Sequence, residues 1–325
     1  MIDVSALSAE LHPLNLAVPP QLSLEEKRFA RFYGIDFNDT IDGVEHWLGS
    51  IDCELASEHH RIAAHYFSKT GATRTCFIVH GYLDHVGLYA KLIDYLLHRG
   101  CNVVAFDLPG HGLSTGARAD IDSFGDYVLV LRCVLEHFYR SVPSPWYIVA
   151  QSTGAAIVMD YLISQQYDES TGPFEKVLLL APLVRARYGR FMRPGRWLLD
   201  KVASSVKRKF NPSSHDQVFL QFLQHEDPLQ VKRLPLNWVK AMLQWEKRFK
   251  QLSWVEQEVL VIQGEGDETV AWQHNLQVIR EKFPRAKIFR IKGAGHHLAC
   301  ESDEYFQRVT QAADIYFDRR RESRG

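Results

Sequence analysis

The chain has 325 residues, of which 46% are hydrophobic, 12% aromatic and 24% charged. This ordinary globular composition excludes a disordered, collagen-like or coiled-coil protein. The 38 Lys and Arg residues nearly balance the 39 Asp and Glu residues, so no general affinity for nucleic acid is expected. The length suggests about two domains, or one α/β domain that carries an insertion.

The cysteines are scattered and odd in number, so they do not predict a disulfide framework: Cys53, Cys76, Cys101, Cys133 and Cys300. We expect buried thiols in a reducing compartment. Residues 1–20 lack the basic start and continuous apolar core of a signal peptide. No apolar stretch approaches the roughly 18 residues that a membrane-spanning helix needs. The sequence therefore predicts a cytoplasmic protein, with peripheral contact at the inner membrane surface as a further expectation.

From about residue 43 onward, short β-rich runs alternate with helical patterns. The predicted strands are 61–67, 75–80, 102–106, 146–151, 176–181, 259–263 and 287–291. The predicted helices are 87–98, 123–139, 152–165, 271–282 and 303–317. Such alternation implies a mostly parallel sheet with helices on both faces.

Residues 185–254 interrupt this alternation, since they contain no β-rich run and look helical throughout, with breaks at 194–195, 211–212 and Pro235. The segment holds 15 Lys and Arg against 5 Asp and Glu, a net charge of +10, whereas the remainder holds 23 against 34, a net charge of −11. Aromatic residues recur among these charges: Trp197, Phe210, Phe219, Phe222, Trp238 and Trp245. The segment is either a solvated helical surface or a basic lid that contacts anionic lipid through residues such as Arg187, Arg190 and Arg193.

These patterns divide the chain into four parts. We expect an N-terminal extension at 1–42, an α/β core at 43–184 and 255–318, a helical cap at 185–254, and a charged tail at 319–325.

The strand at 146–151 runs directly into a serine and then into a helix. The pentapeptide Ala150-Gln151-Ser152-Thr153-Gly154 fits the nucleophile elbow G-x-S-x-G, with alanine at the first small position. Small residues are needed because a strand-to-helix turn this tight brings them against neighbouring strands. Taken alone, the pentapeptide fits either a purely structural turn or a nucleophile, Ser152, exposed at the carboxyl edge of the sheet. The motifs that follow favour the nucleophile.

The strand at 75–80 ends in His80-Gly81-Tyr82. Acyl transfer needs two N–H donors for the tetrahedral oxyanion, and Gly81 allows the loop to approach the serine. The backbone N–H groups of Tyr82 and Thr153 are the predicted pair. For His80 and His85 we expect hydrogen bonds that structure the loop.

An acid and a base are expected after the serine in the chain. Asp267 follows the strand at 259–263, and His296 follows the strand at 287–291. His296 would accept the Ser152 proton, and Asp267 would fix the histidine tautomer. Glu265 and Glu268 are alternative acids, and His297 is the alternative base.

Taken together, these motifs resemble the α/β-hydrolases of the monoacylglycerol lipase and lysophospholipase group, also called serine aminopeptidase-like. The resemblance covers about residues 43–318. It rests on His80-Gly81 with Asp84-His85-x-Gly87-x-Tyr89, Asp107-Leu108-Pro109-Gly110-His111-Gly112-Leu113-Ser114, the turn around Ser152, Gly264-x-x-Asp267-x-x-Val270 and Gly293-Ala294-x-His296. The stretch His225-Glu226-Asp227-Pro228-Leu229 also resembles part of the lid in those lipases.

The resemblance implies an α/β-hydrolase fold with a mostly parallel eight-stranded sheet and a helical cap inserted after strand 6. It implies a serine carboxylic-ester hydrolase that acts on a single-chain acyl lipid, a monoacylglycerol or lysophospholipid, through an acyl-enzyme. No cofactor is expected, and the absence of H-E-x-x-H and paired CxxC motifs gives no reason to expect a metal. The alternatives are an esterase, thioesterase or aminopeptidase for small soluble substrates, and a non-catalytic lipid-binding protein.

Overall fold

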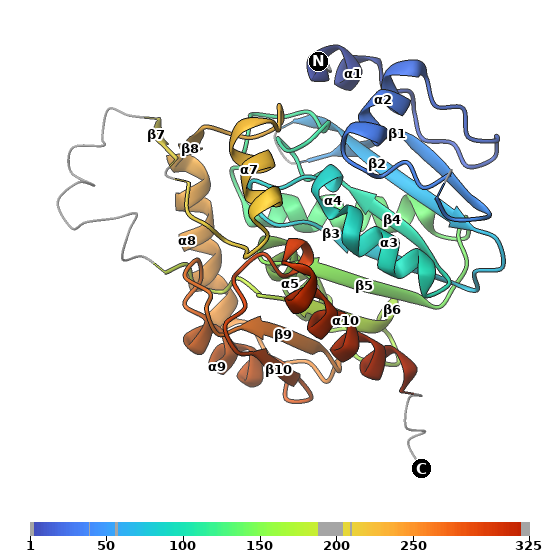
Figure 1. Cartoon of the computed structure of the whole chain (residues 1–325). Coiled ribbons are helices and arrows are strands. Elements are labelled where there is room, and N and C mark those ends of the chain that lie inside the picture. The colour runs from blue at the N-terminus through green and yellow to red at the C-terminus, as the bar shows by residue number, and fades with distance from the viewer. Residues whose placement is uncertain (1–2, 39, 56–57, 188–203, 209, 320–325) are drawn as a thin grey trace.

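An eight-stranded sheet forms the centre of the computed structural model, which describes residues 3–38, 40–55, 58–187, 204–208 and 210–319 (Figure 1). The strands are β1 (Val44–Glu54), β2 (His59–Lys69), β3 (Arg74–Val79), β4 (Cys101–Phe106), β5 (Trp146–Gln151), β6 (Phe174–Leu180), β9 (Leu260–Gly264) and β10 (Lys287–Ile291). They lie in the order β1-β2-β4-β3-β5-β6-β9-β10, with β2 antiparallel to both of its neighbours and the other pairs parallel. The mostly parallel eight-stranded sheet is confirmed, and β1 is a strand for which the sequence patterns gave no range.

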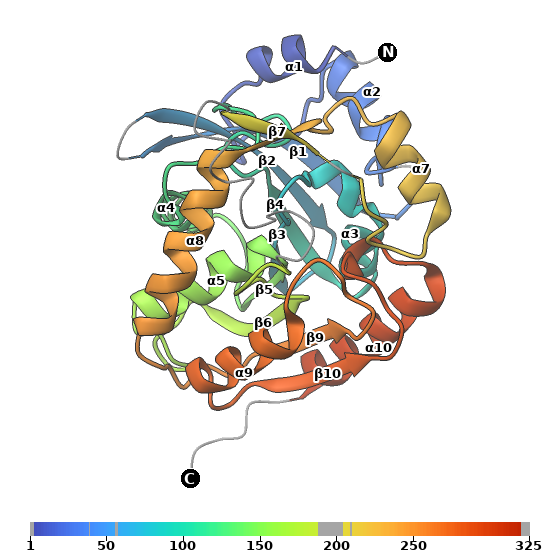
Figure 2. The same cartoon turned by 90° about the vertical axis from the view of Figure 1, so that its left-hand side faces the viewer.

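Helices cover both faces of this sheet (Figure 2). One face carries α4 (Phe124–Phe138), α5 (Thr153–Ser164) and α9 (Trp272–Lys282), and the other carries η1 (Val86–Tyr89), α3 (Ala90–His98), η3 (Leu298–Cys300) and α10 (Asp303–Asp318). Successive strand residues alternate between two hydrophobic cores, so that Phe77 and Val79 point to the first and Cys76 and Ile78 to the second. Burial on both faces explains why central strands such as β4, β5 and β9 are mainly apolar.

The N-terminal extension contains two helices, α1 (Val4–Glu10) and α2 (Leu24–Phe32). Ser23 and Glu26 form a capping box that begins α2, and Phe29 and Ala30 are buried in the second core. The extension is therefore packed onto the α/β core rather than merely preceding it.

Between β6 and β9 the described elements are β7 (Ser205–Lys207), α7 (Gln217–His225), β8 (Arg233–Pro235) and α8 (Leu236–Gln251). The expectation of helix throughout 185–254 is wrong here, because β7 and β8 pair as antiparallel strands. Three residues each are too short to produce a periodic pattern. Pro235 is the N-cap of α8, as the predicted break suggested, whereas the break at 194–195 lies outside the described residues.

Some basic residues of this segment form ion pairs within the protein, and some of its aromatic residues are buried. Arg248 pairs with the buried Asp160 of α5, and Arg185 pairs with Glu246. Trp238 and Trp245 are only 6% and 2% exposed. These two tryptophans therefore do not supply an exposed apolar face for lipid, and Trp197 lies outside the described residues.

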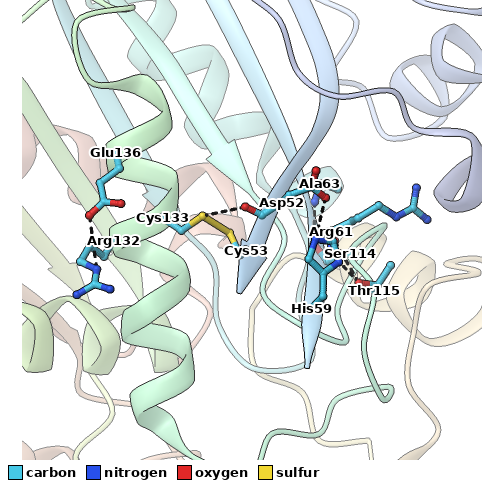
Figure 3. Close-up of a disulfide and its surroundings, with 10 residues drawn as sticks. All are labelled: Asp52, Cys53, His59, Arg61, Ala63, Ser114, Thr115, Arg132, Cys133 and Glu136. Carbon is cyan, nitrogen blue, oxygen red and sulfur yellow. Dashed lines mark hydrogen bonds and ion pairs between the residues drawn. A yellow bond between two sulfur atoms is a disulfide. The ribbon is translucent and has the colours of Figure 1, made fainter. Parts of the chain in front are cut away.

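The expectation that all five cysteines are free thiols is wrong for two of them. Cys53 of β1 forms a disulfide with Cys133 of α4, while Cys76, Cys101 and Cys300 are free and buried (Figure 3). The two partners are 80 residues apart in sequence, and only the packing of α4 against β1 brings them together. No sequence pattern could have paired them.

This disulfide ties an edge strand to a core helix, so we expect it to stabilise the fold. Cys133→Ser should lower the free energy of unfolding by about 2–4 kcal/mol, measured by urea denaturation, because the unfolded chain loses a long covalent loop. A reductant should destabilise the wild type similarly and leave the variant unchanged. Titration of the unfolded, unreduced wild type should find three thiols; five would contradict the disulfide.

Candidate active site

Ser152 occupies a strained turn between β5 and α5, with φ +53° and ψ −109°. A side chain with positive φ persists only where the surroundings enforce it. Gly154 explains part of that enforcement, since a Cβ at this position would lie 2.2 Å from the carbonyl oxygen of Val79. Ala150, at the first small position of the elbow, is fully buried within the sheet. The predicted elbow therefore holds Ser152 at the carboxyl end of β5.

Gly154→Ala should disturb this turn strongly. We expect it to destabilise the fold by at least about 2 kcal/mol, because the new methyl overlaps backbone that cannot move freely. Any activity that depends on Ser152 should fall by about 100-fold as this residue shifts. Thermal unfolding and an assay of that activity measure the two effects.

Gly125→Ala is a matched control, because Gly125 is also the second residue of a helix. A Cβ there meets, among the described atoms, only the Oγ of Ser123, at 3.2 Å. Alanine favours the helix by up to about 1 kcal/mol, so stability should change little and activity should persist. Equal behaviour of the two variants would contradict the role given to Gly154.

The structure brings together the serine, the predicted base and the predicted acid. His296 Nε2 lies 2.9 Å from Ser152 Oγ, and His296 Nδ1 lies 2.6 Å from Asp267 Oδ2. The other carboxylate oxygen accepts hydrogen bonds from the backbone N–H groups of Thr269, at 2.7 Å, and Val270, at 3.1 Å. Asp267 is therefore fixed on one side by backbone and on the other by His296.

The surroundings of Asp267 keep its carboxylate ionised. Burial alone would raise the pKa of Asp267, but the charge and hydrogen bond of His296, with the two N–H donors, hold this pKa below its ordinary value. With the proton on Nδ1, the His296 ring donates to Asp267 and its Nε2 accepts from Ser152. This arrangement can remove the hydroxyl proton and stabilise the resulting imidazolium.

The alternative acids and base do not take part in the contact between Ser152, His296 and Asp267. His297 Nε2 is 2.8 Å from Asp84 Oδ2, so this ring does not stand between Ser152 and Asp267. Burial opposes a charge on His297, but Asp84 nevertheless raises the pKa of His297 well above its ordinary value. Glu265 pairs with Arg290 at 3.4 Å, and Glu268 is exposed.

The two predicted N–H donors have no competing acceptor in the part of the chain that the structure describes. Thr153 is the first residue of α5, where backbone N–H groups lack partners within the helix. Gly81, before Tyr82, lies against the serine, since a Cβ on Gly81 would be 3.4 Å from Ser152 Cβ. His80 structures the loop, as expected, by accepting a hydrogen bond from the Leu108 N–H at 2.9 Å.

Gln151 is a supporting residue that sequence reasoning missed. Its side chain donates to the His296 carbonyl oxygen at 2.9 Å and accepts from the Ala299 N–H at 3.3 Å. It therefore fastens the loop of the base to the strand of the serine. Its place beside Ser152 in the elbow was the only signal, and the motif leaves that position unspecified.

A second missed feature is a buried polar cluster centred on Asp227, in the lid-like stretch of the sequence. Asp227 accepts a hydrogen bond from the Tyr33 hydroxyl at 2.7 Å and contacts His85 Nε2 at 3.1 Å. Gln230 donates to Asp227 and to the carbonyl oxygen of Leu83. The cluster joins α2, the cap and the loop that carries Tyr82.

Ser152 and His296 open into a cavity of about 1030 Å³ whose walls are mainly apolar. Trp238 forms part of this wall and stacks on Tyr82, with ring centroids 3.5 Å apart. A volume of this size suits a ligand at least as large as a drug molecule. Among the described residues, no helix is long and apolar enough to cross a membrane, and no cluster of three or more His, Cys, Asp or Glu side chains is placed to hold a metal ion.

The parallel sheet, the strained serine turn and the Ser–His–Asp arrangement define an α/β-hydrolase with a serine hydrolase centre. The profile of the family described as "Serine aminopeptidase, S33" matches residues 70–303, and the chain belongs to this family. It is thus a hydrolase of the lipase and lysophospholipase type, and the resemblance inferred from the motifs is confirmed.

Individual relatives agree with this assignment. A monoglyceride lipase homolog of Monkeypox virus is 24% identical over 251 residues, which cover 74% of this chain and 87% of the relative. Monoglyceride lipase of Homo sapiens is 32% identical over 126 residues, covering 37% of this chain and 39% of that protein. A soluble variant of monoglyceride lipase from Saccharomyces cerevisiae, solved with a substrate analog, has the same fold, with a TM-score of 0.68 at 16% identity over 83% of this chain and 96% of that one.

Proposed function

We propose that the protein hydrolyses the carboxylic ester of a single-chain acyl lipid, a monoacylglycerol or lysophospholipid, through an acyl-enzyme on Ser152. The observation that carries this proposal is the contact of 2.9 Å between Ser152 Oγ and His296 Nε2, with Asp267 behind the ring and with Ser152 and His296 in the wall of a large, mainly apolar cavity. The names of the relatives support the same substrate class.

In this mechanism Ser152 Oγ attacks the ester carbonyl carbon while its proton passes to His296 Nε2. The Tyr82 and Thr153 N–H groups hold the oxyanion. The bond to the leaving alcohol breaks as His296 returns the proton to the alcohol oxygen. Water, deprotonated by His296, then attacks the acyl-enzyme, which releases the fatty acid and restores Ser152.

A hydrolysis panel tests the substrate class. It compares p-nitrophenyl esters of rising chain length with monoacylglycerols, lysophospholipids, acyl thioesters and aminoacyl amides. We expect kcat/KM to rise with acyl length, because each buried methylene contributes about 0.8 kcal/mol. A preference for short esters, thioesters or amides would replace this proposal by the esterase, thioesterase or aminopeptidase alternative.

We also propose that the cap end of the molecule rests on anionic membrane. Lys240, Leu243 and Lys247 are exposed on one face of α8 and line the cavity that holds Ser152. In the described part of the chain, neither lysine forms an ion pair with a carboxylate. Trp254, just after α8, is 55% exposed. Arg190 and Arg193, which the sequence also suggested, lie outside the described residues.

Vesicle co-sedimentation tests this contact. Binding to phosphatidylglycerol vesicles should weaken with salt and should fall about tenfold or more in Lys240→Glu/Lys247→Glu, since each lysine near the surface contributes about 1 kcal/mol. Lys27→Glu/Arg308→Glu changes the net charge equally on α2 and α10 and should bind like the wild type. Equal binding to neutral and anionic vesicles would contradict the proposal.

We retain two further expectations as proposals. One is the division into a core at 43–184 and 255–318 and a cap at 185–254. The other is a cytoplasmic location at the inner membrane surface. The Cys53–Cys133 disulfide is unusual for a reducing compartment, so the thiol state of protein trapped by alkylation in the cell tests that location.

A further inference from the structure

Four cations of the segment 185–254 line the cavity that holds Ser152: Arg187, Arg208, Lys240 and Lys247. Of these four, Arg208 alone is half-buried, whereas the other three are exposed. Arg208 follows β7, and its backbone N–H donates to the Lys232 carbonyl oxygen at 3.0 Å, which continues the pairing of β7 with β8. Its side chain lines the same cavity as Ser152 and the loop residue Tyr82. The short strand pair therefore places Arg208 in the wall of the cavity that holds Ser152.

The hydrogen-bond partners of the Arg208 guanidinium are neutral. Arg208 Nη1 donates to the side-chain oxygen of Gln230 and, at 3.5 Å, to the carbonyl oxygen of Val231. Among the described residues, no carboxylate forms an ion pair with Arg208. A guanidinium has five N–H donors, so donors remain for a ligand.

The two carboxylates whose charges act on Arg208 already have partners of their own. Asp84 is paired with His297 at 2.8 Å, and Asp227 with His85 at 3.1 Å. Burial lowers the pKa of Arg208, and the more distant charges of Asp84 and Asp227 offset this effect only in part. A cation withdrawn from water in this way gains most from an anion that enters the cavity.

We infer that Arg208 binds a phosphate carried by the leaving group of the substrate, and that the enzyme prefers phosphate-bearing acyl esters to neutral monoacylglycerols. This inference rests on the proposed function. In a lysophospholipid the phosphate is only a glycerol's length from the scissile ester, and the acyl chain can lie along the apolar wall that includes Trp238. An acyl thioester of coenzyme A carries phosphate as well, so the shared chemistry is a phosphate on the leaving group.

Substrates of equal acyl length test the inference: 1-monoacylglycerol, lysophosphatidylglycerol and acyl-coenzyme A, each assayed as monomers. For the wild type, kcat/KM for a phosphate-bearing substrate should exceed that for monoacylglycerol by at least about tenfold. In Arg208→Gln this ratio should fall about 10- to 100-fold, the effect of losing charge-assisted hydrogen bonds. Arg208→Lys should lie between the two, because it keeps the charge and loses the fork of donors. Lys207→Gln, the exposed neighbour on β7, should leave the ratio unchanged.

A measurement on the wild type does not depend on the folding of a variant. Glycerol 3-phosphate should compete with p-nitrophenyl ester hydrolysis at concentrations at least about tenfold lower than glycerol requires. A faster reaction of lysophosphatidylglycerol identifies the lysophospholipid as the source of the phosphate. A faster reaction of acyl-coenzyme A would keep a phosphate site but replace the proposed ester substrate by a thioester. An unchanged ratio in Arg208→Gln, or equal inhibition by the two competitors, would overturn the inference. If the wild type hydrolysed none of these esters, the proposed function would be overturned instead.

Discussion

Ser152→Ala is expected to lose ester hydrolysis by about 10⁴-fold or more while the protein remains folded. Only a hydroxyl in contact with His296 Nε2 can form the acyl-enzyme, and alanine removes this attacking oxygen. Alanine keeps the Cβ of serine, so the strain of the positive-φ turn does not change. Steady-state hydrolysis of a p-nitrophenyl ester measures the loss, and thermal unfolding verifies the fold.

Ser170→Ala, at an exposed loop position, is the control and should match the wild type. A Ser152→Ala protein that retains activity within about tenfold of the wild type would remove Ser152 from the mechanism. Contaminating hydrolases are excluded by requiring that the residual activity co-elute with the variant.

Asp267→Asn should lower kcat by about 10⁴-fold, because an amide can present its N–H to His296 and stabilise the wrong tautomer. The amide is also uncharged, so the imidazolium of His296 loses the carboxylate oxygen that lies 2.6 Å from its Nδ1 in the wild type. The loss should persist across neutral pH. In the wild type the pKa of Asp267 lies below the ordinary value of about 3.9, so this carboxylate stays ionised until the pH falls below that value.

The sign of the stability effect follows from the same shift. A carboxylate whose pKa is lowered by folding stabilises the fold above its unfolded pKa, and this contribution is lost as the pH falls through the folded pKa.

Glu265→Gln and Glu268→Gln should each keep activity within about threefold of the wild type. If either of them were as inactive as Asp267→Asn, the acid would have to be reassigned.

The site residues were predictable because they belong to strand ends. Ser152, Asp267 and His296 each follow a strand of the parallel part of the sheet, and the carboxyl ends of such strands meet at one edge. The spacing of the motifs therefore identified the candidate residues. In the structure these three side chains are in hydrogen-bonding contact, whereas His297 contacts Asp84.

The remaining features depend on contacts between segments far apart in the chain. The Cys53–Cys133 disulfide exists because α4 crosses β1, and the Asp227 cluster exists because the cap meets α2. β7 and β8 are too short for a periodic signal, although their pairing places Arg208 in the cavity. Each of these features is a product of tertiary packing, which a single sequence does not encode in local patterns.

The central claim is that Ser152 is the activated nucleophile, and the site of covalent labelling tests it most directly. The folded protein is treated with a fluorophosphonate, and the adduct is located by peptide mass spectrometry. The account predicts one adduct, on Ser152, that forms at least about 100-fold more slowly in His296→Ala and at the wild-type rate in Lys207→Gln. An adduct on another residue, or no adduct on folded protein that hydrolyses esters, would contradict it.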